Sequence, residues 1–185
     1  MIIEKTACRN ESYCLIFRTS ASFDGDLGGI SGADSICNTD PANPNNGSQF
    51  KAVLVDGINR IACTSTDCST GGVSEGVDWS LKPSVEYRKL DETTVIGETN
   101  SSAIFPFPLI NGISTTAFSL AWTGINSGYL SSSLSCGGWL DNSFGPQGRL
   151  GRVDQVDSNF FSDTIIGVDP CDGALGAHEI ICAEQ

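Results

Sequence analysis

Residues 28–37 read GGISGADSIC, and this stretch decides the fold because it combines a glycine pair, small residues and one cysteine. The pair Gly28-Gly29 predicts a turn of the chain into a short helix over 29–38, since glycine adopts left-handed backbone angles without strain. A phosphate-binding loop would need G-x-G-x-x-G or G-x-x-x-x-G-K-[ST], and the stretch fits neither pattern. The sequence therefore indicates a structural element.

Small side chains within this helix favour close packing. Gly32 and Ala33 leave room for the helix to lie against a sheet. Ser31 is expected to cap the start of the helix, with Asp34 three residues later in a position like that of a capping box.

The rest of the chain alternates short apolar runs with turn signals. Residues 13–20 (YCLIFRTS) predict a strand. Its Leu15 and Phe17 face one side, and Ile16 faces the other. The other expected elements are two strands within 50–63 around a turn at Asp56-Gly57, a turn at Asn111-Gly112, and strands at 119–125 and 179–184.

The length and charge limit the class of protein. The 185 residues fit one α+β domain spanning 1–185, which is long enough to bury a core. The formal net charge is −12. Such a chain lacks the basic surface that nucleic acid or an anionic membrane requires, so neither partner is expected. The acidity fits a basic partner, divalent cations, or solubility alone.

The chain has eight cysteines and a single histidine, His178. A zinc site needs C-x-x-C pairs or several histidines, and the chain has neither. Disulfides are therefore expected, and they indicate an oxidising location outside the cytosol. No apolar run is long enough for a transmembrane segment. The start MIIEKT lacks a signal pattern, so we expect Met1 to precede a mature exported chain whose leader has been removed.

Spacing leaves the disulfide pairing open. Eight cysteines allow about 105 pairings. Cys8 and Cys14 are close neighbours, as are Cys63 and Cys68, and polar residues separate each pair. Closing such short loops would contribute about 2 kcal/mol each in the chain-entropy model. The remaining cysteines are Cys37, Cys136, Cys171 and Cys182.

The order of motifs resembles the C-type-lectin-like superfamily, most closely its endostatin-like branch. The matching segments are GADSIC (32–37), FKAVLV (50–55), AWTGINSG (121–128), CGGWLDNS (136–143), CDG (171–173) and EIIC (179–182). The resemblance implies an α+β fold with small antiparallel sheets, one or two helices, long loops and disulfides. It implies that Cys37 on the helix pairs with Cys182 on the final strand, and that Cys136 pairs with Cys171 inside that loop.

The resemblance also covers the start of the chain. Longer members of the superfamily carry an additional cysteine hairpin, and residues 1–14, with Cys8 and Cys14, match this extension.

A closer likeness is to a family of uncharacterised leptospiral surface lipoproteins. The segments that carry it are LIFRTS (15–20), GDLGGISGAD (25–34), WTG (122–124) and CGGW (136–139). This likeness implies an extracellular or bacterial outer-surface protein without its lipid anchor. It implies no activity, because that family has no assigned chemistry.

Sugar-binding C-type lectins hold calcium with a Glu-Pro-Asn or Gln-Pro-Asp loop, and the chain has neither. Trp139 is therefore expected in the core. Asp24 and Asp26 have the spacing of loop ligands and are weak calcium candidates, although the distal glutamate of an EF-hand is missing. Three further acids offer a second weak calcium option, namely Asp154, Asp157 and Asp163. No other cofactor is expected.

No catalytic pattern is found. A serine or cysteine nucleophile needs a partnered base, and His178 is expected at a strand edge. The motif G-x-S-x-G is absent. The chain is therefore not expected to be an enzyme.

The expected function is non-enzymatic recognition of a host protein, extracellular matrix or glycan at a bacterial surface. Disulfides would hold the core while residues 64–160 present exposed loops. The alternatives are a calcium-dependent lectin, a hydrolase of unknown substrate, and a structural envelope protein. Aromatic residues in or beside this region are candidate interface anchors, with core packing favoured for the last two: Tyr129, Phe144, Phe160 and Phe161.

Overall fold

The computed structural model describes residues 7–9, 11–174 and 176–185. Within them the chain forms an α+β fold with a mixed eight-stranded sheet, two α-helices and four disulfides. Of the expected N-terminal extension, residues 1–14, residues 1–6 and 10 lie outside the described residues.

The elements follow one another with short 3₁₀ turns between them. The strands are β1 (Tyr13–Arg18), β2 (Phe50–Ala52), β3 (Glu86–Arg88), β4 (Val95–Glu98), β5 (Leu120–Trp122), β6 (Gln147–Arg152), β7 (Val168–Pro170) and β8 (Glu179–Glu184). The helices are α1 (Gly29–Thr39) and α2 (Cys136–Trp139), and the 3₁₀ turns are η1 (Thr66–Cys68), η2 (Gly72–Glu75), η3 (Ser127–Tyr129) and η4 (Ser158–Phe160).

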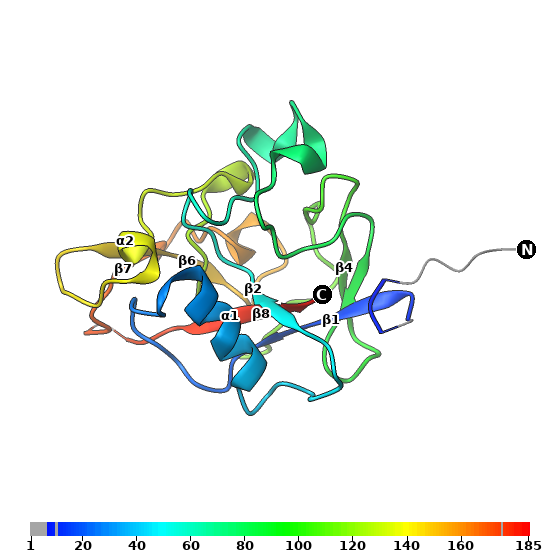
Figure 1. Ribbon diagram of the computed structural model, residues 1–185, viewed down its shortest axis with the longest axis horizontal. Coiled ribbons are helices and arrows are strands. Elements are labelled where there is room, and N and C mark those ends of the chain that lie inside the picture. Colours follow the sequence, from blue (N-terminus) through cyan, green and yellow to red (C-terminus); the bar gives the residue numbers. More distant parts are fainter. Residues whose placement is uncertain (1–6, 10, 175) are drawn as a thin grey trace, which may run out of the picture.

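The last strand, β8, organises the sheet (Figure 1). The strand order is β4-β3-β1-β8-β5-β6-β7, and β2 also pairs with β8. β8 runs antiparallel to β1 and β2 but parallel to β5. Strands from the beginning, the middle and the end of the chain therefore meet on one strand.

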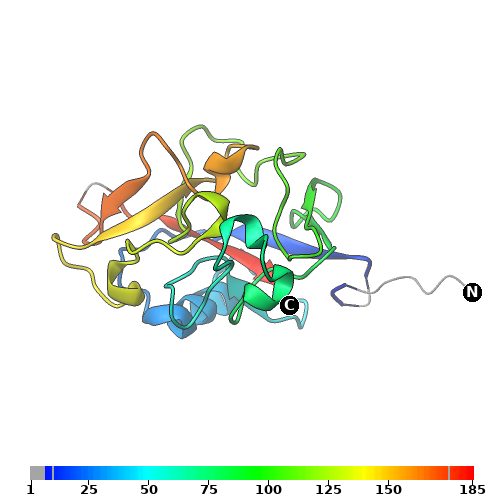
Figure 2. The same ribbon diagram turned by 90° about the horizontal axis from the view of Figure 1, so that it is seen from above.

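The two faces of the sheet bury separate hydrophobic cores, because side chains alternate along each strand. On β1, Leu15 and Phe17 enter the core beneath α1, whereas Ile16 enters the opposite core, as the sequence predicted. On β8, Cys182 belongs to the first core and Ile181 to the second. Figure 2 shows α1 on one side of β1 and β8, with the segments that follow β4 and β6 on the other.

The helix α1 forms where the sequence predicted it. Gly28 and Gly29 have φ angles of 75° and 72°, the left-handed region that glycine tolerates. Ile30, Ala33 and Cys37 are buried, so one stripe of the helix faces the sheet.

The predicted cap of α1 is wrong. Gly28 occupies the N-cap position, and no side chain caps the helix. Ser31 lies inside the first turn, and Asp34 instead accepts hydrogen bonds from Arg60 and from the backbone of Ala52. Gly32 is close to the Leu27 carbonyl, since a Cβ there would lie 2.0 Å from that oxygen. Its small size therefore serves the entry turn as well as packing.

The predicted pair of strands around Asp56-Gly57 is also wrong. Only β2 forms, and residues 58–63 contribute isolated bridges at Ile61 and Cys63. The Asp56 carboxylate accepts hydrogen bonds from the backbone N–H groups of residues 58, 59 and 60. No hairpin forms, because the backbone N–H groups of Val53 and Val55 donate instead to the carbonyls of Ile181 and Thr123.

Residues 64–160 do not form a set of loops outside a separate core. They supply four strands, β3 to β6, and buried aromatic side chains such as Tyr87, Phe105 and Trp122. The turn expected at Asn111-Gly112 joins no pair of strands, because both residues lie in the irregular segment between β4 and β5.

The disulfides join Cys8 to Cys14, Cys37 to Cys182, Cys63 to Cys68 and Cys136 to Cys171. The first and third coincide with the close neighbours in the sequence, and the other two coincide with the pairing implied by the lectin-like resemblance. Cys37 and Cys182 are 145 residues apart, and their Cα atoms are 5.6 Å apart. This bond attaches α1 to the central strand.

Replacing Cys37 and Cys182 by alanine should destabilise the protein more than replacing Cys63 and Cys68. In the chain-entropy model the long loop contributes about 5 kcal/mol and the short loop about 2 kcal/mol. The measurement is the free energy of unfolding of both double variants in guanidinium chloride. Equal losses would contradict the central role of the bond between α1 and β8.

Candidate functional site

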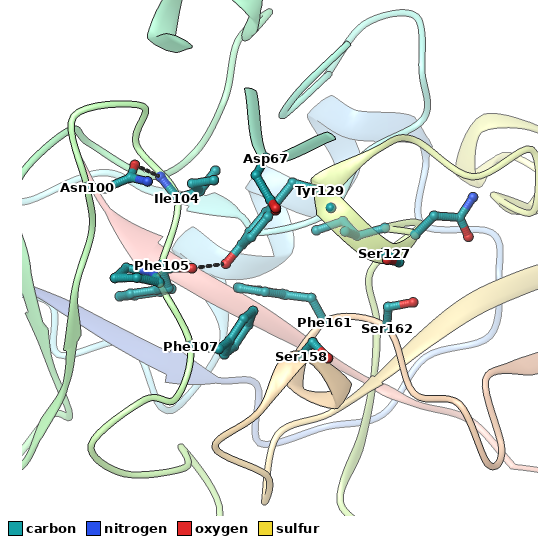
Figure 3. Close-up of a pocket in the computed structure, with 14 residues that line it drawn as sticks. Asp67, Asn100, Ile104, Phe105, Phe107, Ser127, Tyr129, Ser158, Phe161 and Ser162 are labelled. Carbon is teal, nitrogen blue, oxygen red and sulfur yellow. Dashed lines mark hydrogen bonds between the residues drawn. The ribbon is translucent and has the colours of Figure 1, made fainter. Parts of the chain in front are cut away.

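A cavity of about 430 Å³ opens between segments that follow β4, β5 and β6 (Figure 3). We call it the aromatic pocket. Its volume is within the usual range for ligand sites. The lining residues are Asp67, Asn100, Ile104, Phe105, Pro106, Phe107, Ile125, Asn126, Ser127, Gly128, Tyr129, Ser158, Phe161 and Ser162.

Three rings that contact one another form a wall of the pocket, and we call Phe107, Tyr129 and Phe161 the aromatic wall. The Phe107 and Tyr129 rings are nearly parallel, with centroids 6.2 Å apart. The centroid of the Phe161 ring lies 5.4 Å from that of Tyr129 and 6.4 Å from that of Phe107. Phe161 also packs against Phe160 and Phe105, which connect the wall to the core. The rings are therefore held by packing.

Tyr129 is fixed in an unusual backbone conformation. Its φ angle is 61°, which is rare for a bulky side chain. The hydroxyl donates a hydrogen bond of 2.9 Å to the Phe105 carbonyl, and the side chain is buried. Burial raises the pKa of Tyr129 well above its usual value, and the charge of Asp67 acts in the same direction. The ring is thus a rigid and neutral part of the wall.

The loop closed by Cys63–Cys68, which we call the acidic loop, forms one edge of the pocket through Asp67. Glu75 organises this loop, because its carboxylate accepts hydrogen bonds from the backbone and hydroxyl groups of Thr64 and Ser65 and from the backbone N–H groups of Thr70 and Gly71. The N–H of Gly71 and the hydroxyl of Ser65 hold the pKa of Glu75 well below its usual value. An ionised Glu75 therefore fixes the loop at neutral pH.

Gly128 lets this loop approach the wall closely. Its φ angle is 69°, and a Cβ there would lie 2.7 Å from the Thr66 side chain. The backbone N–H of Cys63 also donates a hydrogen bond to the Tyr129 carbonyl. The loop and the turn η3 therefore hold each other in place.

Asp67 projects from this loop beside the aromatic wall (Figure 3). Asp67 is exposed to solvent. Within the described part of the chain, no group donates a hydrogen bond to its carboxylate and no cation pairs with it. Its φ angle of 53° is left-handed, a conformation that aspartate tolerates better than most residues. The adjacent disulfide at Cys68 holds it there.

The structure places the calcium candidates Asp24 and Asp26 away from the aromatic pocket. Asp24 accepts hydrogen bonds from the backbone of Asp26 and from Asn142, and Asp26 accepts one from the backbone of Gly28. Among the described residues no three acidic, histidine or cysteine side chains form a group that could hold a metal ion. Calcium binding here stays a prediction.

The three acids of the second calcium option, Asp154, Asp157 and Asp163, form hydrogen bonds or ion pairs with residues close to them in the sequence. Asp154 pairs with Arg152 at 2.8 Å, Asp157 accepts a hydrogen bond from the backbone of Asn159, and Asp163 accepts one from the backbone of Ile166. These carboxylates belong to separate turns.

Trp139 is completely buried, as the sequence predicted, and donates a hydrogen bond to the Val55 carbonyl. His178 is also buried, immediately before β8. Its Nε2 lies 2.7 Å from Oδ2 of Asp169 on β7. Its ring packs edge-on against Trp122, with the ring centroids 4.6 Å apart. The pair connects β7 to the start of β8.

Sequence reasoning missed a buried ion cluster around Arg60. This side chain is fully buried and forms a bidentate pair with Asp34, with both distances 2.8 Å. Asp78 contacts the same guanidinium at 2.6 Å, and Arg60 also donates to the Ala52 carbonyl. The cluster links α1 to the turn after β2, and nothing in the local sequence signals it.

The four aromatic residues that the sequence suggested as interface anchors differ in solvent exposure. Tyr129, Phe160 and Phe161 are buried, whereas Phe144 is 71% exposed in the loop before β6. Sequence reasoning did not select Asp67, Phe105 or Phe107, because these residues reach the pocket from segments far apart in the chain.

The family described as a protein of unknown function (DUF1554) matches residues 20–156, about three quarters of the chain. The chain belongs to this family. The DUF1554 match includes α1, the acidic loop and the wall residues Phe107 and Tyr129, and it ends before Phe161 and β8. No curated protein matches the chain. The family description assigns no activity.

The four disulfides indicate an extracellular or periplasmic protein, since such bonds persist in oxidising compartments. None of the helices in the described residues has the length and apolar character needed to span a membrane.

Replacing Gly128 by alanine should destabilise the protein by about 1 kcal/mol more than replacing Gly138 by alanine. Both glycines have left-handed φ angles, but a Cβ at Gly138 meets nothing within 4 Å, whereas one at Gly128 meets Thr66. Urea denaturation measures both changes. Equal effects would show that the acidic loop does not need the close approach.

The stability of the protein should fall between pH 7.5 and 5.5 because of His178. Burial lowers the pKa of His178, although Asp169 opposes the shift. The unfolded chain therefore binds a proton more readily, so the stabilisation is complete above about pH 6.5 and is lost as the pH falls below it. Urea denaturation at both pH values should show a smaller loss for His178→Gln. An equal loss in both proteins would contradict this role.

Proposed function

We propose that this chain is a non-enzymatic recognition protein that binds a protein partner of the host or its extracellular matrix through the aromatic pocket. The observation that carries the proposal is a preformed cavity with a rigid aromatic wall and an acidic edge, held in place by a disulfide loop. Aromatic side chains in well-packed pockets are common anchors of protein interfaces.

We also propose that the fold is C-type-lectin-like and that the protein is displayed at a bacterial outer surface. Support for the fold comes from the bond between Cys37 on α1 and Cys182 on the last strand, with Cys136–Cys171 nested inside it. The disulfides support an exported location, and display at an outer surface follows from the likeness to leptospiral surface lipoproteins.

The rigidity of the site favours recognition. Binding sites that are already formed lose less conformational entropy when the partner arrives. The wall is held by ring packing, Tyr129 by its hydrogen bond to Phe105, and the acidic loop by Glu75. A partner would therefore meet a pocket that needs little rearrangement.

The test is surface plasmon resonance of the oxidised chain against purified matrix proteins and a glycan array, in calcium and in chelator. We expect saturable binding to a protein that persists in chelator. Phe107→Ala should weaken binding at least about tenfold, as for an anchor residue. Phe144→Ala removes an equally large but exposed ring outside the pocket and should leave binding unchanged.

Other outcomes contradict the proposal in distinct ways. Binding that needs calcium and selects glycans would support the lectin alternative. Loss of binding in Phe144→Ala but not in Phe107→Ala would place the interface on the loop before β6. Near-ultraviolet circular dichroism of each variant checks that its fold is intact.

A further inference from the structure

We propose that the aromatic pocket receives a cationic side chain, lysine or arginine, of the partner protein. This inference rests on the proposed function and names the chemistry of its anchor. It follows from the charge of the pocket lining, the geometry of its rings and the fixed position of Asp67.

The charge of the lining selects a cation. Asp67 is the only charged residue among the fourteen that line the pocket, and all fourteen lie in the described part of the chain. The chain as a whole carries a net charge of −12. Its long-range field therefore attracts basic partners, and Asp67 gives that attraction a local target.

The aromatic wall selects the same kind of group. A ring face attracts a cation within about 6 Å of its centroid, and the alkyl stem of lysine or arginine packs against neighbouring rings. Phe107 is the wall residue that remains partly exposed, whereas Tyr129 and Phe161 are buried behind it. The chain already uses this contact elsewhere, since the Arg152 guanidinium lies 4.3 Å from the Phe118 ring.

Asp67 is held as a binding group would be. Its carboxylate accepts no hydrogen bond from the described residues, so its lone pairs are available to a ligand, in contrast to those of Glu75 in the same loop. Cys63–Cys68 and the contact of Thr66 with Gly128 fix the backbone that carries it. Figure 3 shows Asp67 beside Tyr129, and both line the same pocket as Phe107 and Phe161, so a cation that enters it meets a carboxylate and aromatic rings.

The test uses small probes, so it does not depend on a partner. The ¹⁵N-labelled, oxidised chain is titrated with ethylguanidinium chloride and, separately, with N-ethylurea, its uncharged isostere. Ethylguanidinium should shift the backbone amides of 126–129 and 104, 105 and 107 with a dissociation constant on the order of 10 mM. N-ethylurea should cause no saturable shift.

Three variants assign the effect to named groups. Asp67→Asn should weaken ethylguanidinium binding about two- to fivefold, the range for one exposed ion pair. Phe107→Leu keeps the apolar volume but removes the ring, and should weaken binding by a similar factor. Asp26→Asn makes the same charge change at an exposed position outside the pocket and should have no effect.

Equal binding of N-ethylurea, unchanged affinity in Asp67→Asn, or saturable binding of a neutral methyl glucoside at the same amides would overturn the inference. The last result would point to a glycan. The failure of the proposed function is distinguishable, because a partner found by surface plasmon resonance that is insensitive to Asp67→Asn and to added ethylguanidinium would overturn only the cationic anchor. The absence of any protein partner would instead overturn the proposed function.

Discussion

The fold depends on the pairing of the last strand, β8, with strands from the beginning and the middle of the chain. This strand pairs with β1, β2 and β5, and the Cys37–Cys182 disulfide ties α1 to it. Alternation along β8 sends Ile180 and Cys182 into one core and Ile181 and Ala183 into the other. Both cores therefore require the last strand. The DUF1554 match ends at residue 156 and therefore does not include β8.

The aromatic pocket is a consequence of this arrangement. Segments leaving β4, β5 and β6 converge on the side of the sheet opposite α1, where Phe105 and Phe161 join the core and Phe107 reaches the cavity. Left-handed backbone at Asp67, Gly128 and Tyr129 is concentrated in the same place. A strained backbone is kept only where surrounding contacts hold it in place. Here the Cys63–Cys68 disulfide, the buried Tyr129 hydroxyl and the packed rings provide those contacts.

Polar clusters complete the scaffold where hydrophobic packing alone would not. Arg60 is enclosed by Asp34 and Asp78, which satisfies a guanidinium that has no access to water. His178 and Asp169 satisfy each other beneath Trp122. The Arg60 cluster joins α1 to the segment after β2, and the His178 pair joins β7 to the start of β8, so each holds two consecutive elements in place.

The sequence by itself determined the elements whose signals are local. A continuous apolar run specified β1, and the glycine pair before small residues specified α1, while close spacing marked Cys8–Cys14 and Cys63–Cys68. Only the tertiary structure decided the partner of Arg60, the loss of the expected hairpin after Asp56, and the meeting of Asp67 with Phe107, Tyr129 and Phe161. The physical reason is range: backbone propensity acts over a few residues, whereas the pocket and the ion cluster arise from the packing of segments that are tens of residues apart.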